Sequence, residues 1–82
     1  MKQQKYGLTH LEKLANEIDR QRMAESVKVT GKFSLTVEFN TTEEPVNFME
    51  FNMLVEEYQC NIQQVAARSD SIVAFFIEQE EA

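Results

Sequence analysis

The chain has 82 residues, a length that suits one domain with a single hydrophobic core. Hydrophobic residues make up 43% of it and the formal net charge is −6, a composition that excludes a disordered chain and indicates a folded acidic protein. There is no apolar run of membrane-spanning length, no signal-peptide core at the N-terminus, and one cysteine, Cys60, which has no partner for an internal disulfide. We therefore expect a cytoplasmic protein without a membrane partner.

The charges are divided unevenly along the chain. Residues 1–32 carry seven Lys or Arg and four Asp or Glu, whereas residues 33–82 carry one Arg and ten Asp or Glu. Such a distribution influences which partners a protein attracts and says little about its fold. The acidic part would repel nucleic acid and attract basic protein surfaces. The alternative is a solvated polar surface that only keeps a small protein in solution.

Residues 9–25 have the pattern of an amphipathic helix. Apolar residues recur at offsets of three and four, with charged residues between them: Leu11, Leu14, Ala15 and Ile18. Thr9 and Glu12 have the spacing of a capping box, in which each side chain accepts a hydrogen bond from the other residue's backbone N–H. The apolar stripe is narrow, so we expect this helix to lean on a surface and not to lie at the centre of the domain.

Residues 26–39 alternate between apolar and polar side chains, as in a strand with one buried and one solvated face. The apolar set occupies odd positions: Val27, Val29, Phe33, Leu35, Val37 and Phe39. Gly31 keeps the phase of the alternation, so we expect one long strand with a bulge or bend at this residue. A Thr-Gly turn is the alternative, because glycine suits the positive φ of tight turns.

A second helix is predicted to begin at Asn47. Asn47 and Glu50 suit an N-cap with its reciprocal partner, and Val46 can pack against Phe51 as a hydrophobic staple. The residues expected to be buried are spaced by three and four: Phe48, Phe51, Val55 and Tyr58.

Residues 61–67 admit two interpretations. Ile62 and Val65 continue the helical spacing, so the helix can extend to Ala67. Alternatively, Asn61 is a left-handed C-cap and residues 62–77 form a hairpin that turns through residues 68–71. We favour the hairpin, because a sheet of two strands would be poorly supported.

The predicted fold is therefore a single α+β domain over residues 1–82. Its elements follow in the order helix, strand, helix, strand, strand. They form a small single layer of mostly antiparallel sheet, of about three strands, packed with two helices.

Few residues are available for catalysis. His10 and Cys60 are the one histidine and the one cysteine, and nothing in their spacing brings them together. Zinc requires three or four such ligands, and a phosphate-binding loop requires clustered glycines. On a helix, Glu56 and Glu57 diverge by about 100°, so they do not converge on one substrate atom. We expect no enzymatic activity, no catalytic residue, no metal and no cofactor.

Direct nucleic-acid binding is disfavoured. The basic residues of positions 1–32 favour phosphate contacts. However, Tyr6 is the only aromatic residue before Phe33, and the pI near 4.7 opposes binding to a polyanion.

The closing segment, residues 71–82, contains six consecutive apolar residues at positions 72–77. In a strand they would make both faces apolar: Ile72, Ala74 and Phe76 on one, and Val73, Phe75 and Ile77 on the other. The helix over residues 9–25 can cover the second face, or another protein chain can. Met49 and Met53, which flank the buried stripe of the central helix, form a second excess apolar surface.

These features predict a non-catalytic protein-binding domain. We expect a small acidic inhibitor or regulatory subunit, of the kind encoded by phages and other mobile elements. It would occupy a basic surface on a target protein, for example a nucleic-acid-binding protein. The predicted partner interface comprises Ile72, Ala74, Phe76, Met49 and Met53, and the predicted acidic steering surface comprises Glu43, Glu44, Glu56 and Glu57. The alternative is a structural protein that assembles with itself, as a homodimer or larger oligomer, through the closing strand.

Overall fold

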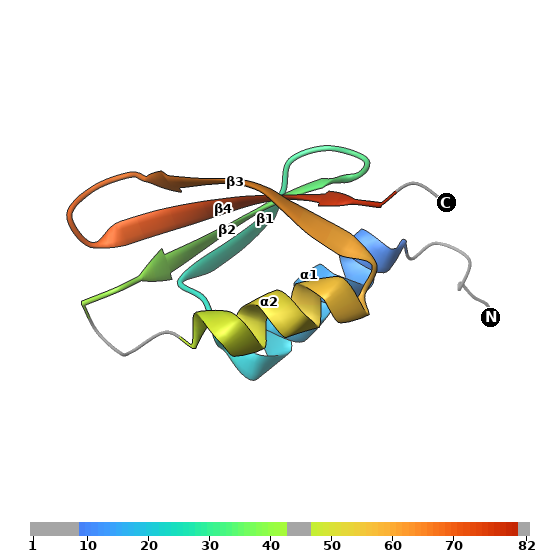
Figure 1. Ribbon diagram of the computed structural model, residues 1–82, viewed down its shortest axis with the longest axis horizontal. Helices are drawn as coiled ribbons and strands as arrows, with labels where there is room; N and C mark the ends of the chain where they lie inside the picture. The colour runs from blue at the N-terminus through green and yellow to red at the C-terminus, as the bar shows by residue number, and fades with distance from the viewer. Residues whose placement is uncertain (1–8, 43–46, 81–82) are drawn as a thin grey trace.

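The computed structural model describes residues 9–42 and 47–80, which form two helices and a four-stranded antiparallel sheet. The elements follow in the order α1 (His10–Gln21), β1 (Ser26–Val29), β2 (Ser34–Asn40), α2 (Phe48–Glu57), β3 (Cys60–Ala67) and β4 (Ile72–Gln79). The strands lie in the order β1-β2-β4-β3, and both helices lie on the same side of the sheet (Figure 1). The predicted α+β class is confirmed, with one strand more than expected.

The capping box predicted for α1 is present. The Thr9 side chain accepts a hydrogen bond from the N–H of Glu12 at 3.1 Å, and the Thr9 N–H donates to Glu12 Oε1 at 3.0 Å. The helix ends at Gln21, earlier than predicted, because Arg22 adopts the left-handed conformation (φ 54°). The first turn is also tied to the sheet, since the Leu11 N–H donates to Gln79 Oε1 at 3.0 Å.

The prediction of one long strand through Gly31 is wrong, because β1 and β2 form a hairpin. The Thr30 N–H donates to the Ser34 carbonyl at 3.0 Å, and Val29 lies opposite Leu35 in the antiparallel register. In this register odd residues lie opposite odd residues, so the alternation keeps its phase through the turn. Retained phase therefore does not distinguish a hairpin from a straight strand. Gly31 has no positive φ.

The hairpin interpretation of residues 61–67 is confirmed. β3 and β4 pair antiparallel, with a bulge or irregularity between Ile62 and Gln64. Helix α2 begins at the predicted N-cap, since Asn47 Oδ1 accepts the N–H of Glu50 at 3.0 Å, but the predicted reciprocal bond from the Asn47 N–H to the Glu50 side chain is not formed. It ends at Glu57, and the left-handed residue beyond it is Gln59 (φ 60°), in place of Asn61. The predicted staple by Val46 lies outside the described residues.

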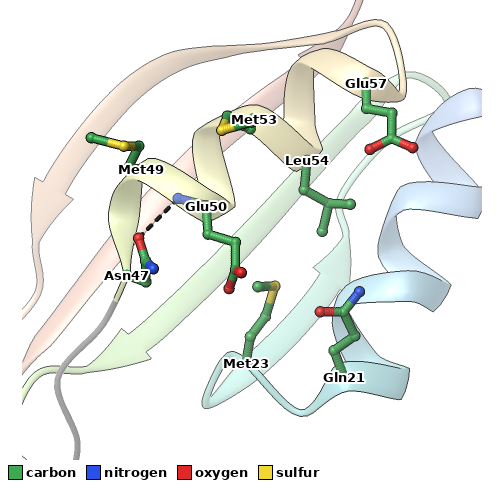
Figure 2. A pocket seen from close by; sticks show the side chains of 8 residues that line it. All are labelled: Gln21, Met23, Asn47, Met49, Glu50, Met53, Leu54 and Glu57. Atoms are coloured by element: carbon green, nitrogen blue, oxygen red, sulfur yellow. Dashed lines mark hydrogen bonds between the residues drawn. The ribbon is translucent and has the colours of Figure 1, made fainter.

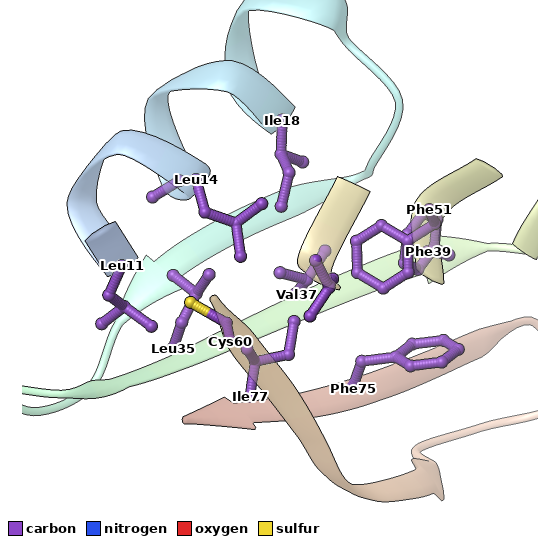
Figure 3. Packing of buried hydrophobic residues seen from close by; sticks show 12 residues of the cluster. Leu11, Leu14, Ile18, Leu35, Val37, Phe39, Phe51, Cys60, Phe75 and Ile77 are labelled. Atoms are coloured by element: carbon purple, nitrogen blue, oxygen red, sulfur yellow. The ribbon is translucent and has the colours of Figure 1, made fainter. Parts of the chain in front are cut away.

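One hydrophobic core lies between the sheet and the two helices (Figure 3). It joins Phe51 and Val55 of α2 to the apolar stripe of α1, which comprises Leu11, Leu14 and Ile18. Alternate residues of β2 and β4 complete it: Leu35, Val37, Phe39, Phe75 and Ile77. The Phe39 ring packs edge-on against the rings of Phe51 and Phe75, with centroids 4.8 and 5.3 Å apart. Phe48, which was expected to be buried, is 42% exposed.

Helix α1 does not cover the face of the closing strand formed by Ile72, Ala74 and Phe76, so the predicted arrangement in which this helix covers the face turned away from the core is wrong. It packs beside α2 on the face formed by Val73, Phe75 and Ile77. A single core shared by both helices encloses more apolar surface than two thin layers on opposite faces. The other face of the sheet is left uncovered by either helix (Figure 1).

Candidate functional site

The uncovered face of the sheet carries three of the residues predicted to contact a partner, namely Ile72, Ala74 and Phe76. Ala74 has no exposed surface, and Ile72 and Phe76 are partly buried. Arg68 covers part of Phe76, since its guanidinium carbon lies 5.6 Å from the ring centroid.

Arg68 is held over this face by an ion pair. Its Nε lies 3.4 Å from Oε2 of Glu38 on β2. The chain therefore shields part of the apolar surface that the closing strand presents. Ile72 and Phe76 stay partly exposed, and their contact with a partner stays a prediction.

The outer side of α2 presents a more exposed apolar surface. Met49 is 76% exposed and Met53 is 63% exposed, the highest values among the large apolar side chains of the described residues. The opposite side of the helix carries Phe51 and Val55, which are buried against the sheet. The five residues of the predicted interface therefore form two surfaces, one on each side of the molecule.

A groove of about 410 Å³ lies between α2 and the end of α1 (Figure 2). In Figure 2, Glu50 and Leu54 extend from α2 toward Met23, which follows α1 in the chain. Met23 and Leu54 also pack against the core, so they form an apolar floor. The residues lining the groove are Gln21, Met23, Asn47, Met49, Glu50, Met53, Leu54 and Glu57. None of these side chains is basic.

Sequence reasoning identified Met49 and Met53 but missed Met23, Glu50 and Leu54. For α2 a signal was present, because residues 50, 53, 54 and 57 have the i, i+3, i+4, i+7 spacing of a second helical stripe beside the buried one. Met23 carries no comparable signal. It reaches the groove because the left-handed Arg22 turns the chain at the end of α1.

The predicted acidic surface is only partly represented in the described residues. Glu56 and Glu57 are exposed in the last turn of α2, and Glu57 lines the groove. Glu43 and Glu44 lie outside the described residues. Because these two carboxylates lie in the last turn of α2, they are at the negative end of the helix dipole. No basic residue in that turn offsets their charge. Glu50 lies in the first turn, where a carboxylate is favourable.

Cys60 is a core residue. It is fully buried, and its thiol donates a hydrogen bond to the Tyr58 carbonyl at 3.4 Å. Burial raises the pKa of the Cys60 thiol, and the nearby Glu80 carboxylate raises it further. A protonated, inaccessible thiol is a poor nucleophile. His10 is exposed at the start of α1.

No three His, Cys, Asp or Glu side chains are grouped so that they could hold a metal ion in residues 9–42 and 47–80. Within the same ranges, neither helix has the length and apolar character needed to cross a membrane.

No protein-family model, no curated protein and no solved structure matches the chain. Its function is therefore inferred from the groove and the surfaces themselves.

Proposed function

We propose that this chain is a non-catalytic protein-binding domain, acting as a small acidic inhibitor or regulatory subunit in the cytoplasm. The observation that carries the proposal is the pair of exposed methionines, Met49 and Met53, beside an apolar groove whose ionisable side chains are all acidic. The target would present a basic amphipathic helix or loop, such as occurs at the nucleic-acid site of a DNA- or RNA-binding protein.

The apolar part of the groove would supply the binding energy. Methionine is flexible and polarisable, so it adapts to irregular partner surfaces. Amphipathic helices dock into apolar grooves of this kind through side chains spaced by three and four residues. With Met23 and Leu54 as a floor and the exposed methionines along its rim on α2, the groove would receive an apolar anchor of the partner.

The carboxylates would select a basic partner. Glu50 and Glu57 both line the groove, and Glu56 lies next to it in the last turn of α2. Carboxylates at a helix C-terminus reduce helix stability. A local feature that opposes stability is expected mainly where it serves function. Complementary charge would also accelerate association and make it depend on salt.

The proposal can be tested with a defined probe. A fluorescent helical peptide with leucine on one face and lysine and arginine on the other is titrated with the protein, and its anisotropy is measured at low and at physiological salt. A second peptide has the same leucines with glutamate in place of the basic residues. We expect the basic peptide to bind, with affinity that falls as salt rises, and the acidic peptide not to bind.

Two variants separate the apolar and charged contributions. Met49→Ser with Met53→Ser keeps the net charge, and we expect it to weaken binding at least tenfold. Glu50→Gln with Glu57→Gln should weaken binding and flatten its salt dependence.

The matched control is Glu25→Gln with Glu78→Gln, which makes the same change in net charge at exposed residues that do not line the groove. We expect it to leave the affinity nearly unchanged. Equal losses in the control and the groove variants would show that the peptide responds only to net charge, and the proposed site would be wrong.

A further inference from the structure

The two edges of the sheet are protected to different extents. The β1 edge has four residues and includes Lys28. The β3 edge has eight residues, and the stretch from 58 to 67 contains no charged residue and no proline. An edge strand has unpaired N–H and C=O groups, and natural proteins usually protect it with charges, proline, bulges or short length. The irregularity between Ile62 and Gln64 is the one such feature in β3, and it leaves Gln64–Ala67 regular.

The outer edge of β3 also carries an apolar side chain. Val65 on β3 is 53% exposed and lies opposite Phe75 of β4. The Phe75 ring is in turn 5.4 Å from the ring of Phe48, which is itself partly exposed. A strand added beside β3 would therefore cover Val65 and extend the apolar surface on the helix side of the sheet.

We propose that two copies of this chain pair through β3, antiparallel about a two-fold axis, to form one continuous sheet. A two-fold interface requires a surface that is complementary to itself. An uncharged strand meets this condition, because two chains of net charge −6 would face no like charges along the seam. This surface is separate from the groove, so the inference goes beyond the proposed function and does not depend on it.

The charges near the ends of β3 favour the antiparallel arrangement. Glu57 lies just before the strand, Glu80 is hydrogen-bonded beside it through its N–H to the Gln59 carbonyl at 2.9 Å, and Arg68 follows its last residue. Eight residues of strand span about 25 Å, well beyond the Debye length of about 8 Å at physiological salt. Antiparallel pairing would therefore separate the two acidic ends and place each beside the other copy's β3–β4 turn, where Arg68 is paired with Glu38 and Asp70 lies two residues further on.

The test is the mass in solution, measured by sedimentation equilibrium from micromolar to millimolar concentration. We expect a concentration-dependent shift from the 9.6 kDa monomer to twice that mass. Val65→Lys places a lysine from each copy in the seam and should weaken dimerisation at least tenfold.

The chain offers a matched control at its other edge. Val29 on β1 is 49% exposed, close to the 53% of Val65, so Val29→Lys makes the same change on an edge strand that the proposal leaves free. We expect it to dimerise as the wild type does. Circular dichroism of both variants establishes that they are folded.

Hydrogen exchange gives a second readout that does not require a variant. Backbone amides of β3 should exchange more slowly as the protein concentration rises, while those of β1 should not change. A wild-type chain that stays monomeric at millimolar concentration would overturn the proposal and leave the β3 edge to a strand of another protein. A dimer that persists unchanged in Val65→Lys would place the interface elsewhere and would also overturn it.

Discussion

The two carboxylates in the last turn of α2 lead to a prediction about stability. Glu56 and Glu57 lie at the negative end of the helix dipole, and that turn contains no basic residue. Replacing both by glutamine removes an unfavourable charge–dipole interaction. We therefore expect Glu56→Gln with Glu57→Gln to be more stable than the wild type.

The magnitude follows from the position of the two residues. Each charge in a terminal turn contributes about 0.3–1 kcal/mol at low ionic strength, so the double variant should gain about 1 kcal/mol in the free energy of unfolding. For a domain of this size, about 1 kcal/mol raises the Tm by about 4–8 °C. The gain should largely disappear at 1 M salt, where the Debye length falls to about 3 Å.

The assay is thermal and urea unfolding followed by circular dichroism, at low and at high salt. Glu50→Gln is the control on the same helix, because Glu50 lies in the first turn, where its charge is favourable. We expect this variant to be less stable by about 0.3–1 kcal/mol. The backbone hydrogen bond from residue 50 to Asn47 is unaffected by the substitution.

The control also separates two explanations. If relief of the net charge of −6 were the cause, removing any one of the three carboxylates would stabilise the protein. A stabilised Glu50→Gln would therefore refute the dipole argument. A double variant at positions 56 and 57 that is no more stable than the wild type would refute it as well, and would weaken the case that these residues are placed for a partner.

Three further predictions concern the fold. Phe39→Ala should lower the free energy of unfolding by about 3–5 kcal/mol, because the ring is buried among other aromatic rings; urea unfolding measures this, and a loss near 1 kcal/mol would contradict the packing. Gln79→Ala removes the acceptor of the Leu11 N–H and should cost about 1 kcal/mol, with faster amide exchange at Leu11; unchanged exchange would contradict that bond. The raised pKa of Cys60 means that the unfolded thiol ionises first, from about pH 8.5. The protonated thiol therefore contributes to the free energy of unfolding below that pH, and this contribution falls as pH rises toward the folded pKa. Urea unfolding of Cys60→Ala should lack this pH dependence.

Several local features could be predicted from the sequence because they depend on neighbouring residues. The capping box of α1 needs Thr9 and Glu12, three positions apart, and the structure contains both of its hydrogen bonds. The start of α2 at Asn47 is equally local. The turn between β3 and β4 was recognisable from its polar residues, which separate two apolar segments.

The hairpin at Gly31 could not be distinguished from a straight strand by alternation. Val27 and Val37 lie opposite one another, and a pairing of odd with odd residues leaves the pattern of apolar side chains unchanged. The choice depends on whether the residues of β1 are stabilised more by pairing with β2 in a hairpin than by continuing β2 as one long strand. That is a property of the sheet and of α1, which packs over this hairpin.

The groove was only partly predictable for a similar reason. Met49 and Met53 stood out as apolar residues beside the buried stripe of α2, whereas Met23 belongs to a different segment. The two segments meet because both helices pack against one core. The spacing of residues 50, 53, 54 and 57 predicts that they share one side of α2, but no sequence pattern predicts that Met23 lies across the groove from them.

The sequence by itself determined the local elements of this protein, because caps, turns and apolar periodicity act over a few residues. It also determined that the closing strand is apolar on both faces. Only the tertiary structure decided that Phe75 faces the core and Phe76 the open side, where Arg68 covers part of its ring. It likewise decided that β4 is central and β3 is an edge. These choices depend on how much apolar surface the whole molecule encloses at once, a quantity that no short segment contains.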